Sequence, residues 1–141
     1  MAEDWQLPRV GEPADPLRLA VFISGSGSGM EVLLKHQQNP DCLHTTNVVI
    51  SDRPDVAGLS KAESLGVTAI VVPLPEIEDA DVRRRTHEDE INEVLADYGV
   101  EAIILSGYMR ILTADFVKPW AGRLLNIHPS LLPDFPGAHA H

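Results

Sequence analysis

The chain has 141 residues, 44% of them hydrophobic, which is enough for one domain with a buried core. Its 11 Lys and Arg residues against 21 Asp and Glu residues give a formal net charge of −10, which argues against a nucleic-acid partner. Cys42 is the single cysteine, so a disulfide within the chain is excluded and a reducing, cytoplasmic location is expected. No signal peptide is visible and no apolar stretch approaches the roughly 20 residues that span a membrane, so no membrane partner is expected.

The first 16 residues are acidic and contain prolines, so we expect a flexible N-terminal tail over 1–16 and one domain over 17–141. Within this domain, short apolar runs alternate with segments of helical character. Gly66 and Gly99 are predicted to end two of the helices. The expected strands cover residues 17–24, 47–52, 67–73, 100–107 and 122–128, and the expected helices cover residues 30–38, 55–66, 79–99 and 113–120.

Alternating strands and helices are typical of right-handed βαβ units. The sequence therefore predicts an α/β fold with an open, mainly parallel, Rossmann-like sheet and helices on both of its faces. The longest expected helix has an apolar stripe of Val82, Ile91, Val94 and Leu95. Ligands of such sheets bind beyond the carboxyl ends of the strands, and three segments that follow strands are candidates for the site.

The first candidate segment is "SGSGSG", residues 24–29, which follows the first strand. Glycines allow the backbone to approach a ligand closely, and the next helix offers its N-terminus to an anion. Met30 stands where a dinucleotide fingerprint has its third glycine, so a single phosphate is favoured over a dinucleotide. The alternatives are a tight turn that binds nothing, and a simple N-cap role for Ser28.

The second segment is "NIHPS", at the end of the last expected strand. Asn126 and His128 are two residues apart, so they point to the same face of a strand. An Asn amide can donate to a developing oxyanion, and a His can exchange a proton near neutral pH. The alternative is a structural His at a strand end.

The third segment is "GYMRIL", whose apolar residues could hold a flat aromatic ligand, although core packing is the alternative for each of them. Residues 83–85, "RRR", are interpreted from their pattern alone as a solvated helix face. His139 and His141 lack supporting carboxylate or cysteine ligands, so no metal site is predicted.

Three stretches, "FISGSGSG", "LSGYMRILTADFV" and "GRLLNIHPSLLPDFPGAHAH", resemble the phosphoribosylglycinamide formyltransferase family, within the 10-formyltetrahydrofolate-dependent formyltransferases. The resemblance runs from Leu17 to His141. It implies the formyltransferase fold and transfer of a formyl group from 10-formyltetrahydrofolate to the amine of glycinamide ribonucleotide, in purine biosynthesis. It implies no metal, and it leaves a homodimer open.

The resemblance also implies roles for individual residues. Asn126 would bind the formyl oxygen and His128 would be the general acid–base group. The substrate phosphate would be held by Gly27, Ser28 and Gly29. The folate would be bound by Arg84, Met109, Arg110, Ile111, Leu112 and Asn126, which replaces the solvated-face interpretation of Arg84.

Two departures from the family pattern lead to further expectations. Gly29 stands where the family loop usually has Asn, which removes one side-chain contact. The catalytic Asp of the family would lie beyond His141, so we expect an incomplete domain that lacks its C-terminal strands and catalyses poorly. The alternatives are a non-catalytic remnant that binds phosphate or folate, and another formyl-folate transferase or hydrolase.

Overall fold

A parallel five-stranded sheet forms the centre of the computed structural model, which describes residues 6–127. The strand order is β3-β2-β1-β4-β5, and each neighbouring pair is parallel. The strands are β1 (Leu17–Ile23), β2 (His44–Ser51), β3 (Ala69–Val71), β4 (Ala102–Ser106) and β5 (Leu124–Ile127).

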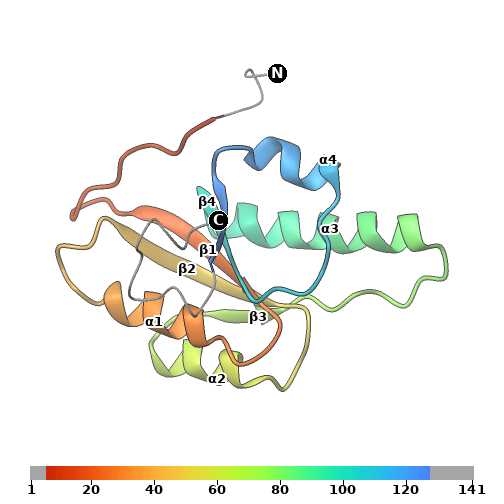
Figure 1. Ribbon diagram of the computed structural model, residues 1–141, viewed down its shortest axis with the longest axis horizontal. Helices are drawn as coiled ribbons and strands as arrows, with labels where there is room; N and C mark the ends of the chain where they lie inside the picture. The colour runs from red at the N-terminus through yellow and green to blue at the C-terminus, as the bar shows by residue number, and fades with distance from the viewer. Residues whose placement is uncertain (1–5, 128–141) are drawn as a thin grey trace, which may run out of the picture.

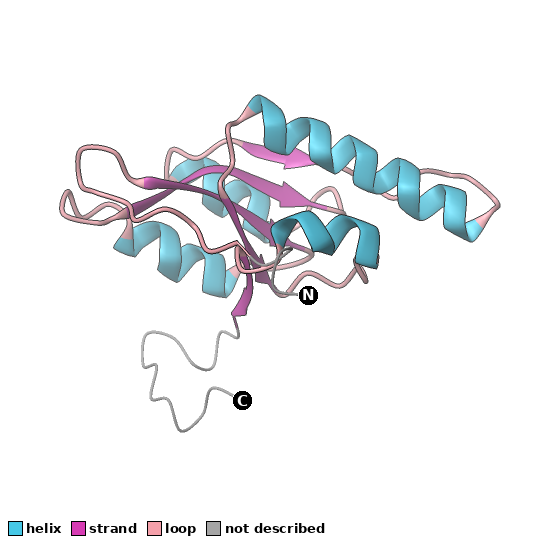
Figure 2. Ribbon diagram, turned by 90° about the horizontal axis from the view of Figure 1, so that it is seen from above, coloured by secondary structure: helices cyan, strands magenta, loops and turns pink. Residues whose placement is uncertain are grey.

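Helices cover both faces of the sheet, as Figures 1 and 2 show. One face carries α1 (Ser28–His36) and α2 (Ala57–Ser64), and the other carries α3 (Ala80–Asp97) and α4 (Ala114–Val117), which continues into the short 3-10 helix η2 (Lys118–Trp120). The predicted fold class, an open Rossmann-like sheet with helices on both faces, is confirmed.

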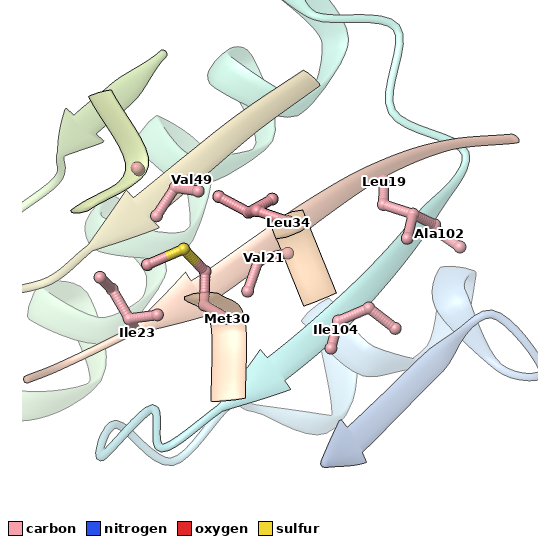
Figure 3. Close-up of a cluster of buried hydrophobic side chains, with 9 residues drawn as sticks. Leu19, Val21, Ile23, Met30, Leu34, Val49, Ala102 and Ile104 are labelled. Atoms are coloured by element: carbon pink, nitrogen blue, oxygen red, sulfur yellow. The ribbon is translucent and has the colours of Figure 1, made fainter. Parts of the chain in front are cut away.

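The core consists of two apolar clusters, one on each face, and β1 contributes to both. Val21 and Ile23 pack toward α1 and α2, whereas Ala20 and Phe22 pack toward α3 and α4. All four side chains are fully buried, because successive residues of a central strand point to opposite covered faces. Figure 3 shows Met30 of α1 lying over the strands of the first cluster. This burial holds the carboxyl end of β1 in a fixed position, where the glycine-rich loop begins.

Glycines end two helices as predicted from the sequence. Gly66 has φ 82°, its N–H donates to the Glu63 carbonyl, and the next N–H, of Val67, donates to the Ala62 carbonyl. This pair of bonds is a Schellman motif, which satisfies two of the last carbonyls of α2. Gly99 ends α3 in the same way.

The prediction of an apolar stripe along α3 is wrong at the amino-terminal end of this helix. Ile91 and Leu95 are buried and Val94 is partly buried, but Val82 is 39% exposed. Figure 1 shows the start of α3 projecting beyond the strands, so its first turn has no sheet to pack against. The buried face begins instead at His87.

Residues 6–16 run along the amino-terminal side of the sheet. The backbone N–H of Gln6 donates to the Ala121 carbonyl over 2.9 Å, and Arg9 Nε lies 2.7 Å from Glu101 Oε2. The division into a flexible tail and a domain that begins at residue 17 stays a prediction, and the contact between Arg9 and Glu101 offers a test. In residues 6–127 no helix combines the length and apolar character needed to cross a membrane.

Candidate functional site

The candidate site lies where the strand order of the sheet reverses. From β1 the chain proceeds outward through β2 to β3, and then returns to place β4 on the other side of β1. In open α/β sheets this reversal leaves a crevice at the carboxyl ends of the two central strands. The glycine-rich loop follows β1 and the segment 107–112 follows β4, so the fold brings these two predicted segments to the same place.

The glycine-rich loop forms one side of a cavity of about 140 Å³. Ser106 and Gly107 of the neighbouring strand end form the other side. The cavity therefore lies between the carboxyl ends of β1 and β4, beside the start of α1. Its lining residues are Gly25, Ser26, Gly27, Ser28, Ser106 and Gly107.

Gly27 is the N-cap of α1 and has a left-handed backbone with φ 66°. A Cβ at this position would lie 2.7 Å from Met30 Cε and 3.1 Å from Gly58 Cα, so a side chain would be both strained and crowded. The alternative role of Ser28 as N-cap is therefore wrong. Because no side chain among residues 6–127 caps α1, the amide groups of its first turn can bind an anion.

The two other predicted phosphate-binding residues differ in their placement. Ser28 is the first residue of α1 and lines the cavity. Gly29 is buried in the first turn and does not contribute to the lining. Any contact of Gly29 with a ligand would use its backbone amide.

Ser106 is a polar residue of this cavity that the sequence analysis missed. It continues the row of Ala102 and Ile104 along β4, on the face that α1 covers. Its side chain is only 4% exposed, and its Oγ has no hydrogen-bond partner among the described residues. An unpaired buried hydroxyl is costly, so a hydroxyl beside a cavity is a natural contact for a polar ligand.

A second cavity, of about 230 Å³, lies between α3 and the segment after β4. It brings together Arg84 and all four predicted folate-binding residues of that segment. Met109 is 73% exposed and Ile111 is 85% exposed, although both are large and apolar. The residues that line this second cavity are Leu74, Arg83, Arg84, His87, Glu88, Met109, Arg110, Ile111 and Leu112.

The polar and charged side chains of this second cavity differ in how many hydrogen bonds or ion pairs they already make within the protein. Glu88 is buried and accepts bonds from the backbone N–H and the hydroxyl of Thr113, at 2.8 and 2.5 Å. His87 Nε2 lies 2.7 Å from the Val72 carbonyl, to which it can donate. Among the described residues, Arg84 makes only a long, exposed contact of 3.8 Å with Asp81, a type of pair that contributes little stability. Arg84 is therefore the cation of this group best able to bind a ligand.

A buried carboxylate ties the segment after β4 to the segment after β1. Asp52, 7% exposed, accepts a bond of 2.6 Å from the Ser24 hydroxyl and one of 3.1 Å from Arg110 Nε. Ser24 Oγ in turn accepts a bond of 2.8 Å from the backbone N–H of Met109. These bonds connect the loops on which the two cavities depend.

Tyr108 anchors the segment after β4 by packing against β1. Its ring packs edge-on against Phe22, with 5.2 Å between the ring centroids. Burial raises the pKa of its hydroxyl well above the ordinary range. The phenol therefore stays neutral, and Tyr108 is better suited to holding the segment than to transferring protons.

The last predicted segment is described only in part. Asn126 is exposed and pairs with Leu105 of β4 in the sheet. It lies on the same strand face as Leu124, which packs toward α3 and α4, but it lines neither of the two cavities. His128 lies outside the described residues. The joint action of Asn126 and His128 therefore stays a prediction.

Comparisons with known proteins match this architecture. A family model described as formyl transferase matches residues 17–141. The trifunctional purine biosynthetic protein adenosine-3 of Bos taurus is 41% identical over 124 residues, which are 88% of this chain and 12% of that protein. Phosphoribosylglycinamide formyltransferase of Escherichia coli is 35% identical over 125 residues, which are 89% of this chain and 57% of the enzyme.

Solved structures agree with the sequence relatives. The crystal structure of phosphoribosylglycinamide formyltransferase from Brucella melitensis superposes with a TM-score of 0.75 at 41% identity, over 89% of this chain and 63% of that one. This chain thus spans a little more than half the length of the single-function relatives it matches. The family match covers all five strands of the sheet and both candidate cavities, and the chain therefore belongs to the formyl transferase family.

Proposed function

We propose that this protein transfers the formyl group of 10-formyltetrahydrofolate to the amine of glycinamide ribonucleotide, a step of purine biosynthesis. The observation that carries the proposal is the position of the two cavities. Gly107 lines one and Met109 lines the other, so they flank a single short segment after β4. Two substrates bound there would approach each other across the carboxyl edge of the sheet.

The ribonucleotide occupies the cavity beside α1. A phosphate group is small enough for about 140 Å³ and matches the uncapped first turn of the helix. Gly27, Ser28 and Gly29 supply backbone amides, and the Ser106 hydroxyl supplies a further contact. The formal net charge of −10 does not oppose this, because binding depends on the local donors.

The folate occupies the cavity beside α3. Its flat ring packs on the exposed side chains of Met109 and Ile111, while Arg110 and Leu112 complete the segment. Arg84 offers a cation to the anionic part of the cosubstrate. Asp52 contributes indirectly, because it holds Arg110 and the Ser24 hydroxyl that receives the Met109 amide.

The reaction needs groups that stabilise negative charge and move a proton. The substrate amine attacks the formyl carbon, the carbonyl oxygen becomes negative, and the bond to the folate nitrogen then breaks. Asn126 donates to this oxygen, which is commonly worth about 2.7–4 kcal/mol for a single donor. His128 assists the proton transfer from the attacking amine to the departing folate nitrogen. We assign no metal and no covalent enzyme intermediate to this step.

The setting of the reaction follows from the composition. A chain with Cys42 as its single cysteine suits the reducing cytoplasm. Its acidic surface suits small-molecule partners better than nucleic acid or anionic membranes. We place the catalytic domain at residues 17–141, and light scattering would distinguish a monomer from a homodimer.

The direct test incubates a chain extended through the Asp segment of the family, and in parallel the 141-residue chain, with 10-formyltetrahydrofolate and glycinamide ribonucleotide, and measures the formylated ribonucleotide by mass spectrometry. The 141-residue chain is expected to form less product than the extended chain. Formation of this product supports the proposal. Release of formate without the product would identify a formyl-folate hydrolase. Binding of either substrate without turnover would favour the non-catalytic alternative.

A binding experiment tests the assignment of the phosphate cavity separately. Titration with glycinamide ribonucleotide is compared with titration with NAD⁺, which carries a diphosphate. Since Met30 replaces the third glycine of a dinucleotide loop, we expect saturable binding of the ribonucleotide alone. Tight NAD⁺ binding with no response to the ribonucleotide would contradict the assignment.

A further inference from the structure

We propose that His36, Cys42 and His44 form a binding site for zinc at the amino-terminal edge of the sheet. One ligand atom from each of these residues lies within 4.8 Å of the other two. His36 is the last residue of α1 and His44 is the first residue of β2, so the cluster lies at the opposite end of the strands from the proposed formyl-transfer site. The site is therefore independent of the catalytic proposal.

The distance between Cys42 and His44 is close to the one that zinc requires. Zinc bonds of about 2.0–2.1 Å to nitrogen and 2.3 Å to sulfur place tetrahedral ligand atoms roughly 3.3–3.6 Å apart. Cys42 Sγ lies 3.7 Å from each ring nitrogen of His44. The rings of His36 and His44 have centroids 6.0 Å apart and planes inclined by 33°. The third ligand is less close, within 4.8 Å, and it belongs to His36, whose exposed side chain has room to turn toward the other two.

The local backbone holds the ligands in place. Cys42 and His44 are separated by a single residue, so their side chains can project to the same side of the chain. The Leu43 carbonyl accepts a bond of 2.8 Å from the N–H of Leu17, which fixes this segment to β1. The Cys42 N–H donates to the Asn39 carbonyl over 3.0 Å, which closes the turn after α1. The cluster is thus built on anchored backbone rather than on a free loop.

A polar chain behind His44 can support coordination. Gln37 Nε2 lies 2.9 Å from His44 Nδ1, and Gln37 Oε1 accepts a bond of 2.8 Å from the hydroxyl of buried Thr46. A hydroxyl can donate or accept, so the Gln37 amide can turn over, and its Oε1 then accepts a hydrogen bond from the Nδ1–H of His44 instead. Nε2 of His44 then faces the ion with its lone pair. Metal-binding histidines usually have an outer partner of this kind, which orients the ring.

The donor set selects the type of metal. Two imidazole nitrogens and one thiolate suit zinc and similar soft or borderline cations, whereas magnesium and calcium prefer oxygen ligands. The Cys42 thiol transfers its proton to solvent when the sulfur binds, and a water molecule completes four-fold coordination. A bound ion would link the end of α1 to the start of β2 and stabilise the folded chain.

The test titrates the 141-residue chain with Zn²⁺ against a chromophoric chelator, with Mg²⁺ as the comparison. We expect one Zn²⁺ per chain and no Mg²⁺ binding at the same concentrations. Cys42→Ser and His44→Ala should each abolish this site. Gln37→Ala should weaken Zn²⁺ binding by about 10-fold or more, as the loss of an outer partner does. The matched control is Gln38→Ala, an exposed residue of the same turn, which should leave binding unchanged.

Two further experiments show whether the bound Zn²⁺ lies at the proposed site. The variant His139→Ala/His141→Ala removes the other histidine pair of the sequence and should bind Zn²⁺ as the original chain does. Co²⁺ added to the unmutated chain should produce a thiolate-to-cobalt charge-transfer band, which reports the Cys42 bond even if Cys42→Ser fails to fold. Absence of Zn²⁺ binding, absence of the cobalt–thiolate band, or loss of binding in the His139/His141 variant would each overturn the proposal.

Discussion

The amino-terminal ends and the carboxyl-terminal ends of the strands form two opposite edges of the sheet. The polar groups at these two edges differ in whether they have hydrogen-bond partners. At the amino-terminal edge, ion pairs connect Arg9 and Arg18 with Glu101, and Gln37 bonds to both His44 and Thr46. At the carboxyl edge, the Ser106 hydroxyl has no partner in residues 6–127 and no side chain caps α1. An unpaired buried hydroxyl and an uncapped helix start both cost stability, and here both lie beside the cavity of about 140 Å³, which favours this edge as the one that receives ligands.

Among substitutions that test the assignment of the carboxyl edge as the ligand-binding edge, Asn126→Ala is expected to have the largest effect, on kcat. If Asn126 donates to the oxyanion, kcat should fall about 10²–10³-fold, because the lost donor acts on charge that develops in the transition state. Binding of the ribonucleotide should change little. The measurement is the formyl-transfer assay under saturating substrates, made in a chain extended through the Asp segment of the family. Asn92→Ala, at an exposed position of α3, is the matched control, and an unchanged kcat in Asn126→Ala would remove this residue from its role.

The second largest effect concerns the packing of α2 against the glycine-rich loop. A Cβ at Gly58 would lie 2.4 Å from Ile23 Cδ1 and 2.8 Å from the Gly25 carbonyl oxygen, so Gly58→Ala should destabilise the fold by about 1–3 kcal/mol. Because the carbonyl belongs to the loop, ribonucleotide affinity should fall as well. Urea unfolding and ligand titration measure the two effects.

Gly25→Ala provides the control for that substitution. A Cβ at Gly25 would meet no atom within 4 Å, so its effect on stability should stay within about 0.5 kcal/mol. Equal destabilisation by Gly25→Ala and Gly58→Ala would contradict the close approach of α2 to the loop.

A smaller effect is expected from Asp52→Asn. The amide oxygen can still accept from Ser24, but the charge that holds Arg110 is lost. Arg110 is 43% exposed, so water replaces part of the lost interaction and the cost in stability should be about 1 kcal/mol. The folate affinity should fall while the ribonucleotide affinity is retained. Isothermal titration with each substrate measures this, and equal losses for both would show that Asp52 acts on the whole edge.

The smallest effect is expected at the amino-terminal edge, from Arg9→Ala. The hydrogen bond from Arg9 is the main cause that lowers the pKa of Glu101 to about 2, from an ordinary value of 4.5. A lowered pKa stabilises the fold above pH 4.5 and loses this contribution as the pH falls toward 2. Arg9→Ala should therefore be slightly less stable than the original chain near neutral pH, with a difference that narrows on acidification.

Acid titrations of thermal unfolding would follow that difference. Arg85→Ala removes the same charge from an exposed position on α3 and serves as the control. If Arg9→Ala had no effect at any pH, residues 6–16 would behave as the flexible tail that the sequence predicts.

Sequence reasoning located the strands and helices well because their signals are local. Apolar runs predicted the strands, and Gly66 and Gly99 predicted helix ends that the structure confirms. Val82 was misplaced because periodicity shows which residues share a helix face, but not how far the sheet extends beneath that face.

The contacts that sequence reasoning missed join residues far apart in the chain. Ser24 and Asp52 are separated by 28 positions, and Asp52 and Arg110 by 58. In the sequence, Ser106 is an ordinary polar residue at a strand end. Its place in a cavity depends on the pairing of β4 with β1, which the sequence does not show. The cluster of His36, Cys42 and His44 has no regular ligand spacing, because a helix end and a turn bring it together.

The strand order has a consequence for how the chain folds during its synthesis. β1 lies at the centre of the sheet, with β2 on one side and β4 on the other. The unit from β1 through α1, α2 and β3 can assemble early because its contacts are short in sequence. The other side of β1 stays open until the ribosome has released residue 106, and Leu19 pairs with Ala102 only then. During this interval an apolar strand edge is exposed, which makes the nascent chain a natural client for chaperones.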